Sequence, residues 1–343
     1  MNIEAGSESD LIYFTWNRKQ HRVTLEKFTG YAMRVVITGA TGFIGRALCR
    51  ALHKDYEVIA LSRDSNRAAK SVGDWASIVE WDGRTTGSWI QQADGALAII
   101  NLAGENVASG RWNKAKKAGI HHSRMDTSRA VLDAVKQTNK KPKVVIQASA
   151  IGYYGSRGIE RLDENSTAGK GFLADVCRNS EIIAGQIESL GVRCAIVRTG
   201  VVLGNGGGAL PRIMQPFRFF LGGHIGNGRQ WFSWISLDDE VAAIKFLMEN
   251  ENLKGVFNLT APKPITMKRF CRKLGWVIRR PSWLFFPGFI MRLALGEMAG
   301  EVLLSGQRVK PKRLLEAGFE FKHNEVKKAL KDIKSQKKKH KHG

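Results

Sequence analysis

Three glycines with a fixed spacing stand where a phosphate-binding turn is expected. The segment reads Thr38-Gly39-Ala40-Thr41-Gly42-Phe43-Ile44-Gly45, between an apolar run at 34–38 and a helical pattern that continues to about His53. Gly39 would allow a sharp turn, Gly42 would let backbone approach a pyrophosphate, and Gly45 would permit close helix packing. The helix N-terminus would offer free N–H groups and a partial positive charge. The segment therefore predicts a dinucleotide-binding turn with contacts from Gly39, Thr41, Gly42, Phe43, Ile44 and Gly45.

The residues after the next apolar run decide which dinucleotide would fit. Residues 57–61 are followed by Ser62-Arg63-Asp64, whereas NAD sites usually place an acidic residue here for the ribose 2′-hydroxyl. A hydroxyl and a guanidinium suit a 2′-phosphate, which arginine can bind with two charge-assisted hydrogen bonds. Ser62 and Arg63 therefore favour NADP over NAD. The alternative is that Arg63 is a solvated loop residue and Asp64 reaches the ribose.

Short apolar runs alternate with helical stretches after Met33. Buried parallel strands joined by helical crossovers have this pattern. The sequence therefore predicts an α/β fold, a Rossmann-like doubly wound parallel sheet with a smaller, mainly helical C-terminal portion. The expected strands are 34–38, 57–61, 96–102, 144–148, 194–197 and 256–259, and the expected helices include 123–138, 173–190, 265–276, 287–295 and 325–333.

Four segments are expected along the 343 residues. Residues 1–32 have little periodicity and are predicted to be a poorly ordered extension without an assigned function. Residues 33–260 would form the NADP-binding domain with its substrate loops, and 261–333 a small C-terminal domain. Residues 334–343 are rich in lysine and are predicted to be a disordered tail. The body between the two ends is long enough to bury a sizeable core.

The chain is strongly basic, with 54 Lys+Arg against 31 Asp+Glu and a net charge of +23. Residues 1–32 are neutral, and the end from Lys331 holds six lysines against Asp332. Most of the excess charge is thus distributed over the globular body. A nucleic-acid site would need it focused on one face. We therefore expect no nucleic-acid partner and rank that class of function last.

The cysteine spacing and the hydropathy of the chain argue against a disulfide-rich, metal-binding, membrane-spanning or secreted protein. Cys49, Cys177, Cys194 and Cys271 lie far apart, so neither a disulfide framework nor a metal site is predicted. The apolar stretch 281–295 is interrupted by Arg292 and is too short to span a membrane. The N-terminal residues have no secretory pattern. The prediction is a cytoplasmic protein without a membrane partner or bound metal.

Several separate motifs, in order, resemble one known family. They are the glycine turn, Asn101-Leu102-Ala103-Gly104, Gly110-Arg111-Trp112, Ser149-Ala150-Ile151-Gly152-Tyr153-Tyr154-Gly155 and Arg198-Thr199-Gly200-Val201-Val202-Leu203-Gly204. The chain resembles the extended and atypical short-chain dehydrogenase/reductase superfamily and, within it, the NAD-dependent epimerase/dehydratase-like family of sugar-nucleotide epimerases. Motifs from Gly296 to Phe319 are similar to the small domain that ends this family. The resemblance covers about residues 33–333.

The resemblance implies further cofactor contacts and a class of substrate. Leu102 and Ala103 would line the adenine or ribose, and Arg124 would reach the cofactor from a helix. Leu102 and Ala103 also lie at the C-terminal end of an expected parallel strand, where open α/β sheets bind ligands. Asn101 is expected to hydrogen-bond between strands rather than take part in chemistry. The implied substrate is a small molecule such as an anionic sugar nucleotide, and the oligomeric state is left open.

The usual catalytic pattern of this superfamily is incomplete here. Conventional members use a Tyr as acid/base, a Lys four residues later to lower its pKa, and a Ser or Thr on the preceding strand. Ser149 lies at the expected place, but residues 172–178 contain neither Tyr nor Lys. Tyr153 or Tyr154 could supply the phenol instead, or both could only fill a loop. Cys177 is expected to be a buried helix residue and not a nucleophile.

These observations leave two main classes of function. The first is an NADP-dependent epimerase or oxidoreductase of the short-chain type acting on a sugar or nucleotide sugar, with Ser149, Tyr153 and Tyr154 as catalytic candidates. The second, favoured by the missing Tyr and Lys, is a catalytically weak protein that binds NADP as a sensor or partner platform.

Overall fold

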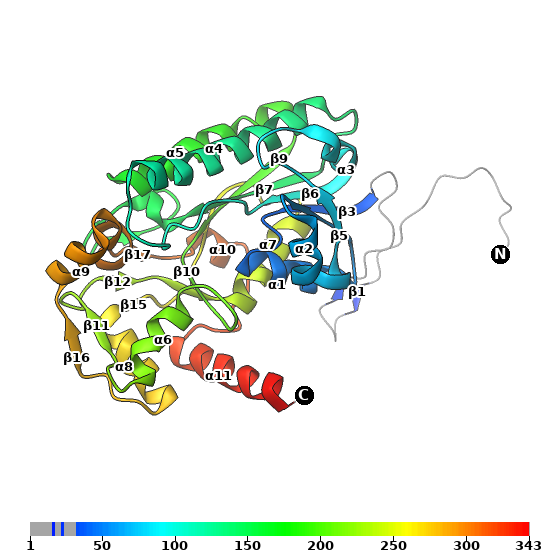
Figure 1. The fold of residues 1–343 in the computed structure, drawn as a ribbon. Helices are drawn as coiled ribbons and strands as arrows, with labels where there is room; N and C mark the ends of the chain where they lie inside the picture. Colours follow the sequence, from blue (N-terminus) through cyan, green and yellow to red (C-terminus); the bar gives the residue numbers. More distant parts are fainter. Residues whose placement is uncertain (1–15, 18–21, 24–31, 343) are drawn as a thin grey trace, which may run out of the picture.

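The computed structural model describes residues 16–17, 22–23 and 32–342, with side chains described for 33–337 (Figure 1). The predicted extension at 1–32 therefore lies largely outside the described residues. Within it, β1 (Trp16–Asn17) pairs antiparallel with β2 (Arg22–Val23). None of the helices in the described ranges has the length and apolar character needed to cross a membrane.

A seven-stranded parallel sheet forms the centre of the molecule, in the order β14-β9-β7-β6-β3-β4-β5. From β3 the chain steps outward to β5, and from β6 it steps outward in the other direction to β14. The switch point lies between β3 and β6, where open sheets bind ligands beyond the carboxyl ends of the strands. The doubly wound fold predicted from the sequence is confirmed. The strands are β3 (Ala32–Thr38), β4 (Glu57–Ser62), β5 (Ser77–Glu80), β6 (Ala96–Asn101), β7 (Val144–Ala150), β9 (Arg193–Thr199) and β14 (Gly255–Leu259).

Helices cover both faces of this sheet (Figure 1). Alternate residues of each strand point to opposite faces, so Val35 and Ile37 enter one core and Val36 the other. Four helices pack into the first core: α1 (Phe43–Leu52), α2 (Ser65–Val72), α7 (Leu237–Glu249) and α10 (Lys312–Glu316). Three helices pack into the second core: α3 (Ile90–Ala93), α4 (Lys114–Gln137) and α5 (Phe172–Gly185). α4 begins well before its predicted start at 123, because the Asn113 side chain caps it by accepting from the Lys116 N–H.

The smaller portion is assembled from two stretches of chain, residues 201–236 and 265–295, rather than from 261–333 alone. β11 pairs with β16 and β12 with β15 across these stretches, and Phe217, Phe232 and Phe270 share one core. The predicted boundary at 260 therefore does not separate two cores. The smaller portion contains the elements β10 (Val201–Leu203), α6 (Leu210–Arg218), β11 (Gly223–Ile225), β12 (Trp231–Phe232), β13 (Trp234–Ser236), β15 (Ile265–Thr266), α8 (Met267–Ile278), β16 (Leu284–Phe286) and α9 (Gly288–Leu295). Separately, β8 (Arg161–Leu162) pairs with β17 (Arg308–Val309).

The tail predicted to be disordered from residue 334 is helical instead. α11 (Val326–His342) continues through it without a glycine or proline to end the helix. Ile333 is buried in the core shared with α8, and the Lys334 ammonium donates to the Val277 carbonyl at 2.6 Å. The prediction was wrong because the basic residues continue a helix that is anchored by its apolar side.

Candidate active site

The glycine turn joins β3 to α1, as predicted, and lies at the switch point of the sheet. Gly39 has φ +66°, and a Cβ at this position would lie 2.8 Å from the Leu102 carbonyl carbon, so only glycine fits. Gly42 is exposed and precedes α1, whose N-terminus has no side-chain cap. The first N–H groups of α1 are therefore available to an anion, and the turn fits a pyrophosphate.

Phe43 packs beneath a second glycine-rich loop. A Cβ at Gly207 would lie 2.6 Å from the Phe43 ring, and positions 204 and 208 are similarly close. The Arg46 guanidinium donates to the Gly206 carbonyl at 3.2 Å. The loop 204–208 therefore covers the start of α1 and helps to hold the turn in place.

At the end of β4, Asp64 begins a helix. Its carboxylate accepts from the Arg67 N–H at 2.9 Å and caps α2, while the Ser62 hydroxyl donates to the Asp64 carbonyl at 3.1 Å. Arg63 is exposed between them. The alternative in which Asp64 reaches the ribose loses support, because the capping bond already holds its carboxylate.

A line of polar side chains crosses the sheet beneath the turn. The Thr38 hydroxyl donates to Asn101 Oδ1 at 2.6 Å, and the Asn101 amide donates to Gln147 Oε1 at 2.9 Å. The Thr38 oxygen also accepts from the N–H groups of Leu102 and Ala103 at 3.1 and 3.2 Å. Asn101 thus joins strands as predicted, and the hydrogen bonds fix the backbone after β6.

Arg124 reaches the same side of the site from α4. Its guanidinium donates to the Ile120 carbonyl at 3.0 Å, and a Cβ at Gly104 would lie 3.2 Å from its Cζ. Burial lowers the pKa of Arg124, and Glu105 partly offsets this. The pKa of Glu105 is lowered chiefly by a hydrogen bond from Lys116, with contributions from the charges of Arg63 and Arg124. The charges of Arg63 and Arg124, the two arginines predicted to contact the cofactor, therefore both lower the pKa of Glu105.

Ser149 begins a buried polar network. Its hydroxyl donates to Glu181 Oε1 at 2.6 Å, and Glu181 forms a two-point ion pair with Arg198 at 2.9 and 2.7 Å. Arg198 also donates to the Tyr154 hydroxyl at 3.0 Å, which donates to Asn258 Oδ1 at 2.7 Å. The network links the carboxyl ends of β7, β9 and β14.

Of the two tyrosine candidates, Tyr154 does not face a possible substrate. Its side chain is fully buried, and burial raises its pKa to about 12. Tyr154 is therefore a structural member of the network, and the prediction of a catalytic role for it is corrected. Tyr153 is only half-buried, with the Arg198 guanidinium 3.3 Å from its ring centroid. Among the described residues, none forms a hydrogen bond with the Tyr153 hydroxyl.

α5 presents Cys177 and Glu181 to Ser149, one helical turn apart. Cys177 is buried, and desolvation raises the pKa of its thiol, so the prediction that it is a buried helix residue is confirmed. Sequence reasoning missed Glu181 and the role of Arg198. The only local signal was the spacing of four residues between Cys177 and Glu181, which places both on one helix face.

A cavity of about 400 Å³ opens beside this group. Gly152 and Leu173 line it, and a Cβ at Gly152 would come within 4.0 Å of the Cys177 sulfur. Glu301, from the single π-helical turn Ala299–Leu304, accepts from the N–H groups of Phe172 and Leu173 at 3.2 Å each and so caps α5. Lys170 and Arg292 add positive charge to the walls of the cavity, and Glu297 and Glu301 add negative charge. The cavity can hold a polar small molecule.

Glu240 is a buried acid below the carboxyl end of β9. Burial raises its pKa to about 8, although Thr199 donates to it at 2.8 Å. Because the folded protein holds this proton more tightly than the unfolded chain does, the group's contribution to stability falls as the pH rises from about 4.5 to about 8. Glu240→Gln keeps the bond from Thr199 but cannot ionise. We expect the variant to gain stability relative to the parent from about pH 5 to about pH 9.

Urea unfolding of both proteins at the two pH values measures this gain. Glu316→Gln, at an exposed position, is the matched control and should show a constant difference. A constant difference for Glu240→Gln as well would contradict the raised pKa.

The sequence of this chain matches two protein-family models. A model of the NAD dependent epimerase/dehydratase family matches residues 35–260, more than half of the chain. The chain belongs to this family. A second model, a domain of unknown function (DUF1731), matches residues 286–333, where the sequence resembles the family's small terminal domain.

Relatives within the family match over nearly their whole length. The chain is 42% identical to the chloroplastic SDR39U1 homolog of Arabidopsis thaliana, over 88% of this chain and 86% of that one. It is 36% identical to the epimerase family protein YfhF of Bacillus subtilis, over 87% and 98%. The solved structure of human SDR39U1 with NADPH superposes with a TM-score of 0.78 at 31% identity, covering 88% of this chain and 98% of that one.

Proposed function

We propose that this protein binds NADP(H) and is an oxidoreductase or epimerase for a sugar or nucleotide sugar, in the cytoplasm. The main support for NADP(H) binding is the glycine turn at the switch point, where the first N–H groups of α1 have no side-chain cap and Arg63 is exposed at the end of β4. The human relative solved with NADPH supports the choice of cofactor. The contacts proposed from the sequence are retained: Gly39, Thr41, Gly42, Phe43, Ile44, Gly45, Ser62, Arg63, Leu102, Ala103 and Arg124.

The residues around the cavity suggest how a substrate would be handled. A bound nicotinamide would accept or donate hydride. The Ser149 proton points to Glu181, so the serine oxygen keeps lone pairs to accept a hydrogen bond from a substrate hydroxyl. Tyr153 is the group proposed to move the proton. Lys170 and Arg292 would bind an anionic part of the substrate, such as a diphosphate, while Glu297 and Glu301 in the same walls could accept from sugar hydroxyls.

A second candidate is a protein that binds NADP(H) without turnover. It is favoured by one observation, that α5 presents a protonated thiol and an ion-paired carboxylate to Ser149 instead of a tyrosine and a lysine. Incubation of the protein and NADP⁺ with nucleotide sugars deuterated at their ring carbons separates the two candidates, because an oxidoreductase leaves deuterium on the nicotinamide and an epimerase inverts a ring carbon. Retained cofactor binding with neither deuterium transfer nor inversion would favour the second.

Arg63→Ala tests the choice of cofactor. Hydrogen bonds to a charged group contribute about 1.5–3 kcal/mol, so we expect NADPH affinity to fall by about tenfold to a hundredfold. NADH affinity should be unchanged, because NADH has no 2′-phosphate. Fluorescence titration with both nucleotides measures this, with Arg67→Ala on the exposed side of α2 as the matched control. An NADPH preference that survives in Arg63→Ala would contradict the assignment.

A further inference from the structure

The smaller portion of the molecule contains two stretches without any acidic residue. Residues 200–236 and 260–296 hold eleven Lys and Arg and no Asp or Glu. They fold together through the β11–β16 and β12–β15 pairs. The excess charge is therefore concentrated at one end of the molecule and is less evenly distributed than the sequence alone suggested.

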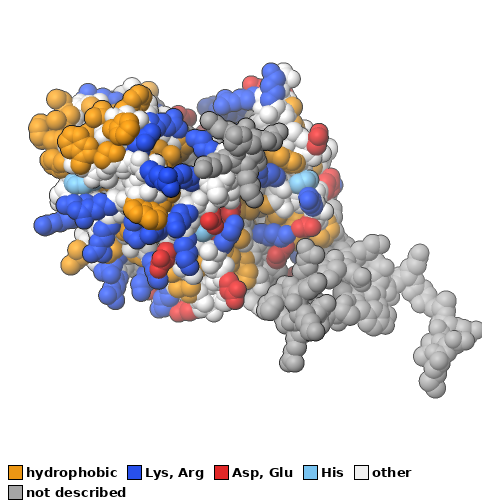
Figure 2. Space-filling model, turned by 90° about the horizontal axis from the view of Figure 1, so that it is seen from below, with side chains coloured by type: hydrophobic (Ala, Val, Ile, Leu, Met, Phe, Trp, Pro, Cys, Tyr) orange, Lys and Arg blue, Asp and Glu red, His pale blue; other side chains and the backbone are white. Residues whose placement is uncertain are grey.

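The same end carries an exposed apolar patch. Figure 2 shows hydrophobic side chains gathered at one end of the molecule beside Lys and Arg side chains. The patch comes from the turn after α6, from β16 and its approach, and from α9. Phe289 is 72% exposed, Leu293 77% and Trp283 68%. Patches of this kind on a monomer usually mark a binding surface. Its main residues are Phe219, Phe220, Trp283, Phe285, Phe289 and Leu293.

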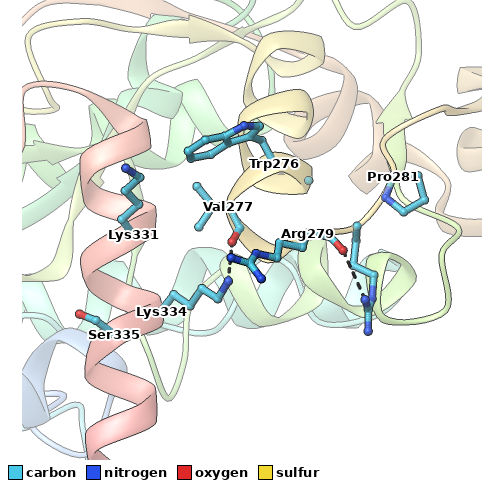
Figure 3. Close-up of a pocket in the computed structure, with 9 residues that line it drawn as sticks. Trp276, Val277, Arg279, Pro281, Lys331, Lys334 and Ser335 are labelled. Atoms are coloured by element: carbon cyan, nitrogen blue, oxygen red, sulfur yellow. Dashed lines mark hydrogen bonds between the residues drawn. The ribbon is translucent and has the colours of Figure 1, made fainter.

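A cationic groove adjoins the patch. A cavity of about 750 Å³ lies between α8 and α11, and its walls carry Arg279, Arg280, Lys331 and Lys334 without an acidic residue (Figure 3). The Arg280 guanidinium stacks 4.4 Å from the Phe220 ring centroid, which joins groove and patch into one surface. The partner of this surface must therefore offer both apolar area and negative charge.

We propose that this surface docks on an anionic lipid bilayer, with the apolar patch inserted at the interface and the cationic groove over the headgroups. Aromatic and aliphatic side chains enter the headgroup boundary, and each nearby Lys or Arg adds attraction to anionic lipid. Such docking needs no membrane-spanning helix. It is separate from the glycine turn proposed to bind NADP(H), whereas α9 also supplies Arg292 to the proposed substrate cavity.

Two other partners fit less well. A second copy of the chain would bring two strongly basic surfaces together, and like charges repel. Nucleic acid could bind the Lys and Arg side chains and stack on the aromatic rings. It would offer no apolar surface to Leu293 or Ile290, which are exposed beside those residues. Of these three partners, the bilayer is the one that accommodates the aliphatic residues, the aromatic residues and the charge.

Sedimentation with vesicles tests the proposal on the full chain. We expect binding to phosphatidylcholine vesicles that contain phosphatidylglycerol and weak binding to phosphatidylcholine alone. Phe289→Asp and Leu293→Asp should each weaken binding roughly tenfold or more. Ile182→Asp is the matched control, since Ile182 is 59% exposed on α5, outside the patch, and should bind as the parent does.

A second measurement does not depend on an introduced charge. Vesicles that carry brominated lipid should quench tryptophan emission, and Trp283→Phe should remove much of the quenching while binding persists. Equal binding with and without phosphatidylglycerol, or unaltered binding by the patch variants, would overturn the proposal. It would also be overturned if the variants changed only the sedimentation velocity of the free protein or only its binding to a single-stranded oligonucleotide.

Discussion

Glu181→Leu is expected to destabilise the protein by about 3–5 kcal/mol, because it leaves the Arg198 guanidinium as an unpaired charge in the interior. Arg198 is 3% exposed and Glu181 8%, so water cannot take over the lost contacts. Ser149 loses its acceptor in the same variant. Urea unfolding followed by circular dichroism measures the loss, which is a large part of the stability of an ordinary domain.

The double variant Glu181→Leu/Arg198→Met is the control for this prediction. Replacing both members of a buried ion pair by apolar residues is often neutral or stabilising, so the double variant should recover most of the loss. If Glu181→Leu alone unfolded at the urea concentration of the parent, the ion pair would not be the stabilising contact that its burial indicates.

Gly45→Ala is expected to disrupt the glycine turn and to abolish measurable NADPH binding. A Cβ at Gly45 would lie 2.3 Å from the Gly39 oxygen and 2.7 Å from the Ala40 Cα. Both atoms belong to the backbone, so either the turn or α1 must move. Overpacking of this kind costs about 1–3 kcal/mol and occasionally more. Thermal unfolding and fluorescence titration with NADPH measure the two effects.

The same substitution at another helical glycine serves as the matched control. No atom lies within 4 Å of a Cβ built at Gly119 in α4. Gly119→Ala should therefore stabilise the protein by about 0.5–1 kcal/mol and leave NADPH binding unchanged, because alanine is the better helix former. Normal NADPH affinity in Gly45→Ala would show that the turn tolerates a side chain and would remove the steric argument.

Local sequence was sufficient to predict six of the seven strands of the sheet and the glycine turn. A buried strand reads as a short run of Val, Ile and Ala, and the turn requires glycine at fixed positions between a strand and a helix. Both features depend on residues that are neighbours in the chain. Short or amphipathic elements were harder to predict: the half-exposed edge strand β5 has no continuous apolar run, and α11 continues into a tail that looks disordered by composition.

The sequence by itself determined the fold class, the turn at Gly39 to Gly45, the position of Ser149 and the absence of the usual tyrosine and lysine. Only the tertiary structure decided which tyrosine is buried, that Glu181 and Arg198 hold Ser149, and that the acid-free stretches meet at one apolar end. The physical reason is distance along the chain. Glycine turns and apolar runs obey local rules, whereas an ion pair or a surface patch exists only after strand order and helix packing bring separate segments together.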